Sequence, residues 1–153
     1  MKTFKIKVFS FILIISFFIG VPSVIAQVEY WGEFCWQVNV TTSKLDPLLV
    51  KVGATHMGDY HFLLSGKITS LSSAEVIGSL HGNADVDGGN VVMTLVCTGT
   101  SSLEKFGQMM NVTLDISTLS GTFFLVGTHY TQGDVNPIGN HYDEGTMSRI
   151  TCP

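Results

Sequence analysis

The chain has 153 residues, of which 45% are hydrophobic and only 13% are charged. Three of the eight basic residues and none of the twelve acidic ones lie in residues 1–26, so the rest of the chain has five basic and twelve acidic residues and a formal charge of −7. This balance argues against nucleic acid or an anionic membrane surface as a partner, because both attract basic proteins.

Residues 1–26 are typical of a secretory signal peptide. Basic residues precede an apolar run over residues 8–19, and small residues follow at the cleavage position. The apolar run is shorter than a transmembrane helix needs. We therefore expect cleavage between Ala26 and Gln27, a secreted or periplasmic location, and a single domain over residues 27–153 that is long enough to bury a core.

Eight segments of the remaining chain have the alternation and the turn boundaries of β-strands, and no amphipathic helix competes with them. Residues 101–107 are the exception, since they are compatible with one helical turn. The sequence predicts an all-β fold: a single antiparallel up-and-down β-barrel of about eight strands whose last strand pairs with the first, with a β-sandwich as the alternative. The expected strands are residues 33–42, 48–56, 60–69, 75–86, 91–99, 109–116, 122–130 and 146–152.

The clearest strand pair is the hairpin over residues 75–100. Its turn, Asp87–Asn90, contains two glycines that can adopt the positive φ of tight hairpins. Closing this turn sets Leu80 opposite Cys97, and it leaves one face apolar or bare and the other largely polar, as a half-buried pair requires.

The register of the two preceding expected strands, residues 48–56 and 60–69, follows from requiring apolar residues to pair with apolar residues on the same face. A three-residue link over residues 57–59 pairs Val52 with Leu64 and avoids placing Lys51 opposite Lys67. The same rule, applied to the next strand, aligns three inward glycines across three neighbouring strands. Such a row favours the bending that closes a barrel, although it would also leave room for a ligand. These glycines are Gly66, Gly78 and Gly99.

Two more strands have assignable inner faces. The strand over residues 122–130 has apolar residues on both faces, and we place inside the set that leaves Thr122 and Thr128 outside. That inner set is Phe123, Leu125, Gly127 and His129. The first expected strand turns inward Phe34, Trp36, Val38 and Val40.

Three cysteines in an oxidising compartment indicate one disulfide and one free thiol. Barrel closure brings the end of the last strand beside the start of the first, where Cys35 and Cys152 both face outward. We therefore predict a Cys35–Cys152 disulfide and a buried free thiol at Cys97. Pairing of Cys97 with Cys152 across one barrel end is the alternative.

The mouth of the barrel is expected at the end with the longest loops, residues 101–107 and 131–145. The second loop and its start contain residues that can bind metals, but their spacing matches no zinc or calcium motif. We expect no metal and no cofactor. The residues concerned are His129, Asp134, His141, Asp143 and Glu144.

No catalytic residues are predicted, since the chain has no Gly-x-Ser-x-Gly elbow, Ser-x-x-Lys motif or phosphate-binding glycine loop. Cys97 with His129 is a weak candidate, because a thiol among apolar side chains has a raised pKa. His56 and Tyr60 are expected to face inward near the other end, where they fill space. Outward-facing polar residues are His61 and His81, with Asn39 and Asn111 of two glycosylation sequons that matter only in a eukaryotic host.

By its layout the chain resembles the calycin class of barrels, the lipocalins and their relatives. Members of that class have a first-strand tryptophan, in a Gly-x-Trp motif, packed against a basic residue of the last strand. Trp31 or Trp36 with Arg149 matches this pair, but the motif is absent, because Tyr30-Trp31-Gly32 has the reverse order. The resemblance implies a barrel that encloses a small apolar ligand.

The leading hypothesis is therefore a secreted or periplasmic barrel that binds a small, mostly apolar molecule. The alternatives are a filled barrel that acts through its surface, an outer-membrane barrel, and a cyclase-type enzyme that uses His129 or His56. We expect no stable membrane insertion, since aromatic girdles are missing. The expected ligand-binding residues are Trp36, Phe62, Leu64, Leu80, Met93, Leu95, Met110, Leu125 and His129.

Overall fold

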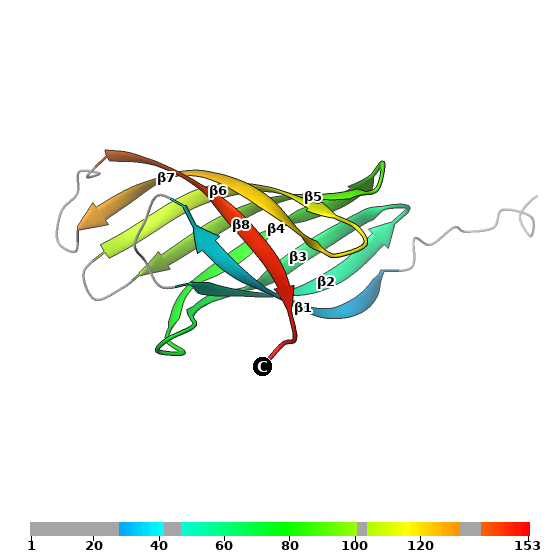
Figure 1. Cartoon of the computed structure of the whole chain (residues 1–153), viewed down its shortest axis with the longest axis horizontal. Coiled ribbons are helices and arrows are strands. Elements are labelled where there is room, and N and C mark those ends of the chain that lie inside the picture. The colour runs from blue at the N-terminus through cyan, green and yellow to red at the C-terminus, as the bar shows by residue number, and fades with distance from the viewer. Residues whose placement is uncertain (1–27, 42–46, 101–103, 132–138) are drawn as a thin grey trace, which may run out of the picture.

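The computed structural model describes residues 28–41, 47–100, 104–131 and 139–153. The described residues form eight strands, each antiparallel to the next, and the last pairs with the first to close a barrel (Figure 1). The predicted up-and-down barrel is confirmed. The strands are β1 (Glu29–Val40), β2 (Leu48–Gly58), β3 (His61–Ser70), β4 (Val76–Asp87), β5 (Asn90–Thr100), β6 (Glu104–Asp115), β7 (Ser120–Thr131) and β8 (Gly139–Ile150).

The predicted signal peptide and its cleavage bond fall in residues 1–27, outside the described residues, and stay predictions. Across the residues that are described, no helix is long and apolar enough to span a membrane.

Two sequence predictions about the loop end were wrong. The helical turn proposed for residues 101–107 is absent from residue 104 onward, because β6 begins at Glu104. The long loop proposed for residues 131–145 is strand from Gly139, since β8 pairs with β7 there. Polar residues in this segment favoured a loop, but two of them, His141 and Asp143, face the barrel interior.

The hairpin of β4 and β5 has the predicted register. Leu80 pairs with Cys97, Gly78 with Gly99, and the turn closes between Asp87 and Asn90. The glycines of that turn, Gly88 and Gly89, both have positive φ.

The predicted registers of β2 with β3 and of β3 with β4 were wrong by two residues. Val52 pairs with Gly66, and Lys51 does lie opposite Lys67. The connection between β2 and β3 is tighter than expected, because Gly58 and Asp59 adopt positive φ. The register of the two strands also shifts beside Gly58. The predicted lysine repulsion is offset by a third strand, since Lys51 Nζ lies 2.8 Å from a carboxylate oxygen of Glu33 in β1.

This shift removes Gly66 from the predicted glycine row, since Gly66 pairs with Leu80. The curvature interpretation survives the correction. A Cβ on Gly66, Gly78 or Gly99 would overlap backbone atoms of the neighbouring strand. Close approach of this kind is what a strongly coiled sheet requires of its inward positions.

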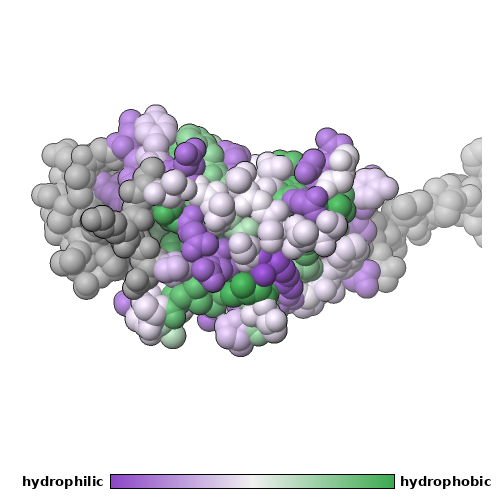
Figure 2. Space-filling view, in the orientation of Figure 1, coloured by the Kyte–Doolittle hydropathy of each residue, from purple (hydrophilic) through white to green (hydrophobic). Residues whose placement is uncertain are grey.

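The middle of the barrel is packed solid. Leu80, Leu95 and Cys97 are each at most 1% exposed and belong to one hydrophobic cluster. Gly82 pairs with Leu64 on one side and with Leu95 on the other, so large side chains occupy the space beside a missing one. On the outer face shown in Figure 2, polar and neutral residues cover most of the surface and apolar residues form separate patches.

The seam between β1 and β8 is reinforced by covalent and polar contacts. Cys35 and Cys152 form the predicted disulfide, and Cys97 is free and buried. The guanidinium of Arg149 lies 5.0 Å from the ring centroid of Phe34 and 5.6 Å from that of Trp36. It also donates a hydrogen bond of 3.0 Å to the carbonyl oxygen of Cys35, so cation–π and hydrogen-bond contacts cross the seam.

Replacing Gly82 by alanine should destabilise the barrel, because the new Cβ would overlap the carbonyl oxygen of Thr94. We expect the free energy of unfolding to fall by about 1–3 kcal/mol or more, as for other overpacked positions. Gly107→Ala is the matched control, since a Cβ there meets nothing within 4 Å. It should change stability by no more than about 1 kcal/mol. Urea denaturation of both variants is the measurement, and equal midpoints for the two would contradict the close-approach argument.

Candidate functional site

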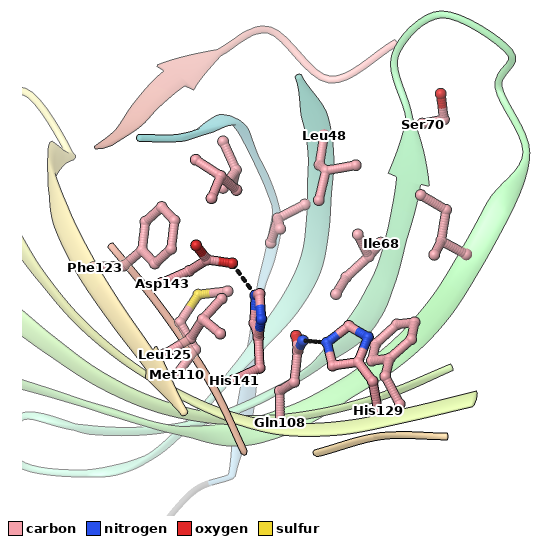
Figure 3. Close-up of a pocket in the computed structure, with 15 residues that line it drawn as sticks. Leu48, Ile68, Ser70, Gln108, Met110, Phe123, Leu125, His129, His141 and Asp143 are labelled. Atoms are coloured by element: carbon pink, nitrogen blue, oxygen red, sulfur yellow. Dashed lines mark hydrogen bonds and ion pairs between the residues drawn. The ribbon is translucent and has the colours of Figure 1, made fainter. Parts of the chain in front are cut away.

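A cavity of about 350 Å³ lies at the end of the barrel where β1–β2, β3–β4, β5–β6 and β7–β8 connect. We call it the loop-end cavity; it lies at the end predicted as the mouth. Most of its wall is aliphatic or aromatic, and polar side chains gather on one side (Figure 3). It is lined by Val38, Val40, Leu48, Val50, Ile68, Ser70, Ile77, Phe106, Gln108, Met110, Phe123, Leu125, His129, His141 and Asp143.

Four of the polar lining residues form a connected group on β6, β7 and β8, which we call the polar cluster: Gln108, His129, His141 and Asp143. The ring centroids of His129 and His141 are 4.7 Å apart. Gln108 Nε2 donates to His129 Nε2 over 2.8 Å, and His141 Nε2 is paired with Asp143 Oδ2. The amide and both imidazoles therefore meet at one wall of the cavity, as Figure 3 shows.

Gly127 is the reason that this cluster fits on three neighbouring strands. It pairs with Gln108 of β6 on one side and with His141 of β8 on the other. A Cβ on Gly127 would overlap the side chain of Gln108. The missing side chain thus leaves the space in which the residues of the polar cluster approach one another.

Asp143 is the most unusual member of the cluster, because it is a carboxylate that is only 6% exposed. A buried charge is costly unless it is paired. His141 supplies a pairing group, and its own side chain is 40% exposed and lies towards the cavity. An imidazole held by a carboxylate can donate or accept a hydrogen bond and can act as a general base.

The metal hypothesis gains no support from this geometry. Within the described ranges, no group of three or more histidines, cysteines, aspartates and glutamates is arranged to hold a metal ion. Glu144 is exposed on the opposite face of β8 from Asp143, and Asp134 lies outside the described residues.

The predicted ligand-binding residues are divided between three places. Met110, Leu125 and His129 line the loop-end cavity. A second cavity, at the end of the barrel where the turns β2–β3, β4–β5 and β6–β7 lie, has walls formed by Trp36, Phe62, Leu64 and Met93. We call it the turn-end cavity. Leu80 and Leu95 line neither cavity, since they belong to the packed middle layer.

Gln108 was not predicted from the sequence, and His141 and Asp143 were predicted to lie in a loop. A usable signal was present in the alternation of β8, because an Arg149 that packs against a tryptophan of the first strand has to face inward. Continuing that period of two towards the N-terminus brings Asp143 and His141 to the same face. The inner face proposed for β7 is confirmed, since Phe123 and Leu125 are buried.

The other histidines have structural surroundings. A ring nitrogen of His56 lies 2.9 Å from the carbonyl oxygen of Asp59, and the ring packs beside Trp31 and Phe62. His61 and His81 are exposed, as predicted. The inward placement of Tyr60 was wrong: it lies in the tight β2–β3 turn and is 68% exposed.

Comparison of the chain with protein-family models, curated proteins and solved structures gives no significant match. The fold and the site therefore define a class only: a closed eight-stranded antiparallel barrel with a disulfide at its seam and internal cavities. The pairing of Trp36 with Arg149 expected from the lipocalin resemblance is present. A single pair of this kind assigns no family.

Cys97 should behave as an inert thiol, because burial raises its pKa to about 11. The folded thiol therefore ionises at higher pH than the unfolded one. We expect stability to be unaffected by this group at neutral pH and to fall by up to about 3 kcal/mol as the pH rises from about 9 to 11. The measurement is urea denaturation at several pH values in wild type and in Cys97→Ala. The difference between the two proteins in how the free energy of unfolding changes with pH gives the contribution of the Cys97 thiol. The same pH dependence in both proteins would contradict the prediction.

Proposed function

We propose that this protein binds a small, mostly apolar molecule in the loop-end cavity. The observation that carries the proposal is a cavity of about 350 Å³ with apolar walls and a polar cluster at one side. Binding sites for small molecules typically measure about 300–1,000 Å³ and combine apolar walls with a few convergent polar groups. The loop-end cavity has both properties.

The two kinds of wall suggest how such a ligand is oriented. Its apolar body would lie against Val38, Ile68 and Phe106. Each Å² of apolar surface that is removed from water there contributes about 25 cal/mol to the free energy of binding. A single polar group would lie against the polar cluster, where histidine can serve as donor or acceptor. A ligand with one polar end thus satisfies both walls at once.

The compartment proposed is extracytoplasmic. A disulfide such as Cys35–Cys152 forms and persists in an oxidising environment. Together with the signal-like residues 1–26, this supports a secreted or periplasmic protein. The burial pattern supports a barrel outside the membrane, since the apolar residues are gathered in the lumen and lipid-facing barrels have the reverse arrangement.

The alternative is a barrel that acts through its outer surface. It is favoured by a row of apolar residues across four strands, in which Val96 faces Met109, Met109 faces Val126 and Val126 faces Tyr142. Val96 and Tyr142 are 52% and 62% exposed. Native mass spectrometry of protein purified from its source separates the two ideas, because a container carries a bound small molecule and a surface module does not.

Narrowing the loop-end cavity should weaken binding of an apolar probe. We expect N-phenyl-1-naphthylamine, an uncharged dye that brightens in apolar surroundings, to bind the wild type with a saturable fluorescence rise. Val40→Phe puts a ring at the cavity wall and should weaken binding at least tenfold.

Val96→Phe is the matched control, because it makes the same change on the exposed outer face of β5. It should bind the dye as the wild type does. Equal binding by all three proteins, or a loss of binding only in Val96→Phe, would show that the dye binds elsewhere and would reject the loop-end site.

A further inference from the structure

The turn-end cavity is a separate space of about 190 Å³ whose walls are entirely apolar. None of its lining residues also lines the loop-end cavity. Between the two cavities lies the packed middle layer, in which Val52, Leu80 and Leu95 are at most 1% exposed. A molecule in one cavity therefore has no direct contact with a molecule in the other.

Four aromatic rings shape this cavity. Trp31 and Phe62 meet edge to face with centroids 4.8 Å apart, and Phe34 and Trp36 are stacked at 6.1 Å. Trp31 is 55% exposed, so it stands at the rim, whereas Trp36 is buried. Aromatic rings of a ligand gain from edge-to-face and offset contacts with such walls.

Two polar groups next to this cavity, the Trp36 indole and the Arg149 guanidinium, have partners within the protein. Trp36 Nε1 donates a 2.7 Å hydrogen bond to the carbonyl oxygen of Leu119. The Arg149 guanidinium is stacked on Phe34 and Trp36 and donates to the carbonyl oxygen of Cys35. The side chains that line the cavity are all apolar or aromatic, so a polar or charged group brought into it would lose its water without a charged or amide side chain of the lining to pair with, which is unfavourable.

We propose that the turn-end cavity is a second binding site, selective for a small uncharged aromatic molecule of about one ring. An apolar cavity of about 150 Å³ stays dry and accepts benzene, so the space available here is sufficient for a substituted single ring. This inference is independent of the proposed function, because it concerns another cavity with other walls and another ligand chemistry.

The chain supplies its own reporter for this site, since it has two tryptophans and both line the turn-end cavity. Bromobenzene, whose heavy atom quenches tryptophan fluorescence on contact, is the probe. We expect saturable quenching in the wild type. We expect only weak, linear quenching by 4-bromobenzoate at neutral pH, because this ring carries a carboxylate that the cavity cannot pair.

Ala84→Leu fills the turn-end cavity from β4 and should weaken the saturable quenching at least tenfold. Val40→Phe, at the opposite end of the barrel, should leave it unchanged and thus serves as the control. Linear quenching of the wild type by bromobenzene, or equal quenching by the two probes, would overturn the proposal without reference to any variant. The dye experiment tests the loop-end cavity separately, so one binding site can be rejected while the other is supported.

Discussion

Closure of the sheet between β1 and β8 is the constraint on which both cavities depend. In the part of the chain that the structure describes, the paired register of the two strands runs over Cys35–Val40, which is a short seam for strands of this length. Open edges would leave unpaired backbone groups and remove a wall from each cavity. The disulfide, the Arg149 stack and its hydrogen bond to the Cys35 carbonyl all act at the turn end of this seam.

Closure also decides where the barrel is solid and where it is hollow. A closed barrel of eight strands has an interior just wide enough for side chains to fill or for one small ligand. Inward glycines, such as Gly82 beside Leu95, let the strands coil while large residues fill the space in the middle layer. A cavity lies on either side of this layer, and the two cavities differ because their walls differ. One has a polar cluster and the other has only apolar and aromatic side chains.

The sequence predicted those features that depend on alternation and turn chemistry. The β4–β5 hairpin has an unambiguous turn, and closure of eight strands placed Cys35 beside Cys152. The registers of β2 with β3 and of β3 with β4 were missed by two residues for a definite reason. A shift of two preserves the face of every side chain, so the hydrophobic pattern cannot detect it. For β2 with β3, the distinguishing features are the positive φ of Asp59 and the ion pair of Lys51 with Glu33 of a third strand, neither of which pairwise alternation includes.

The polar cluster was missed because its residues contradict the rule that was used to find strands. His141 and Asp143 lie on an inward face where the pattern calls for apolar residues. Replacing a buried polar pair by apolar residues often leaves stability unchanged or higher. The turn-end cavity demonstrates that this same barrel can build a wall without polar groups. The fold therefore does not require the inward His141–Asp143 pair at the loop end. Polar residues at positions where the strand pattern calls for apolar ones are expected at functional sites. This contrast supports the loop-end cavity, rather than the larger set of buried residues, as the place where the sequence is adapted to a ligand.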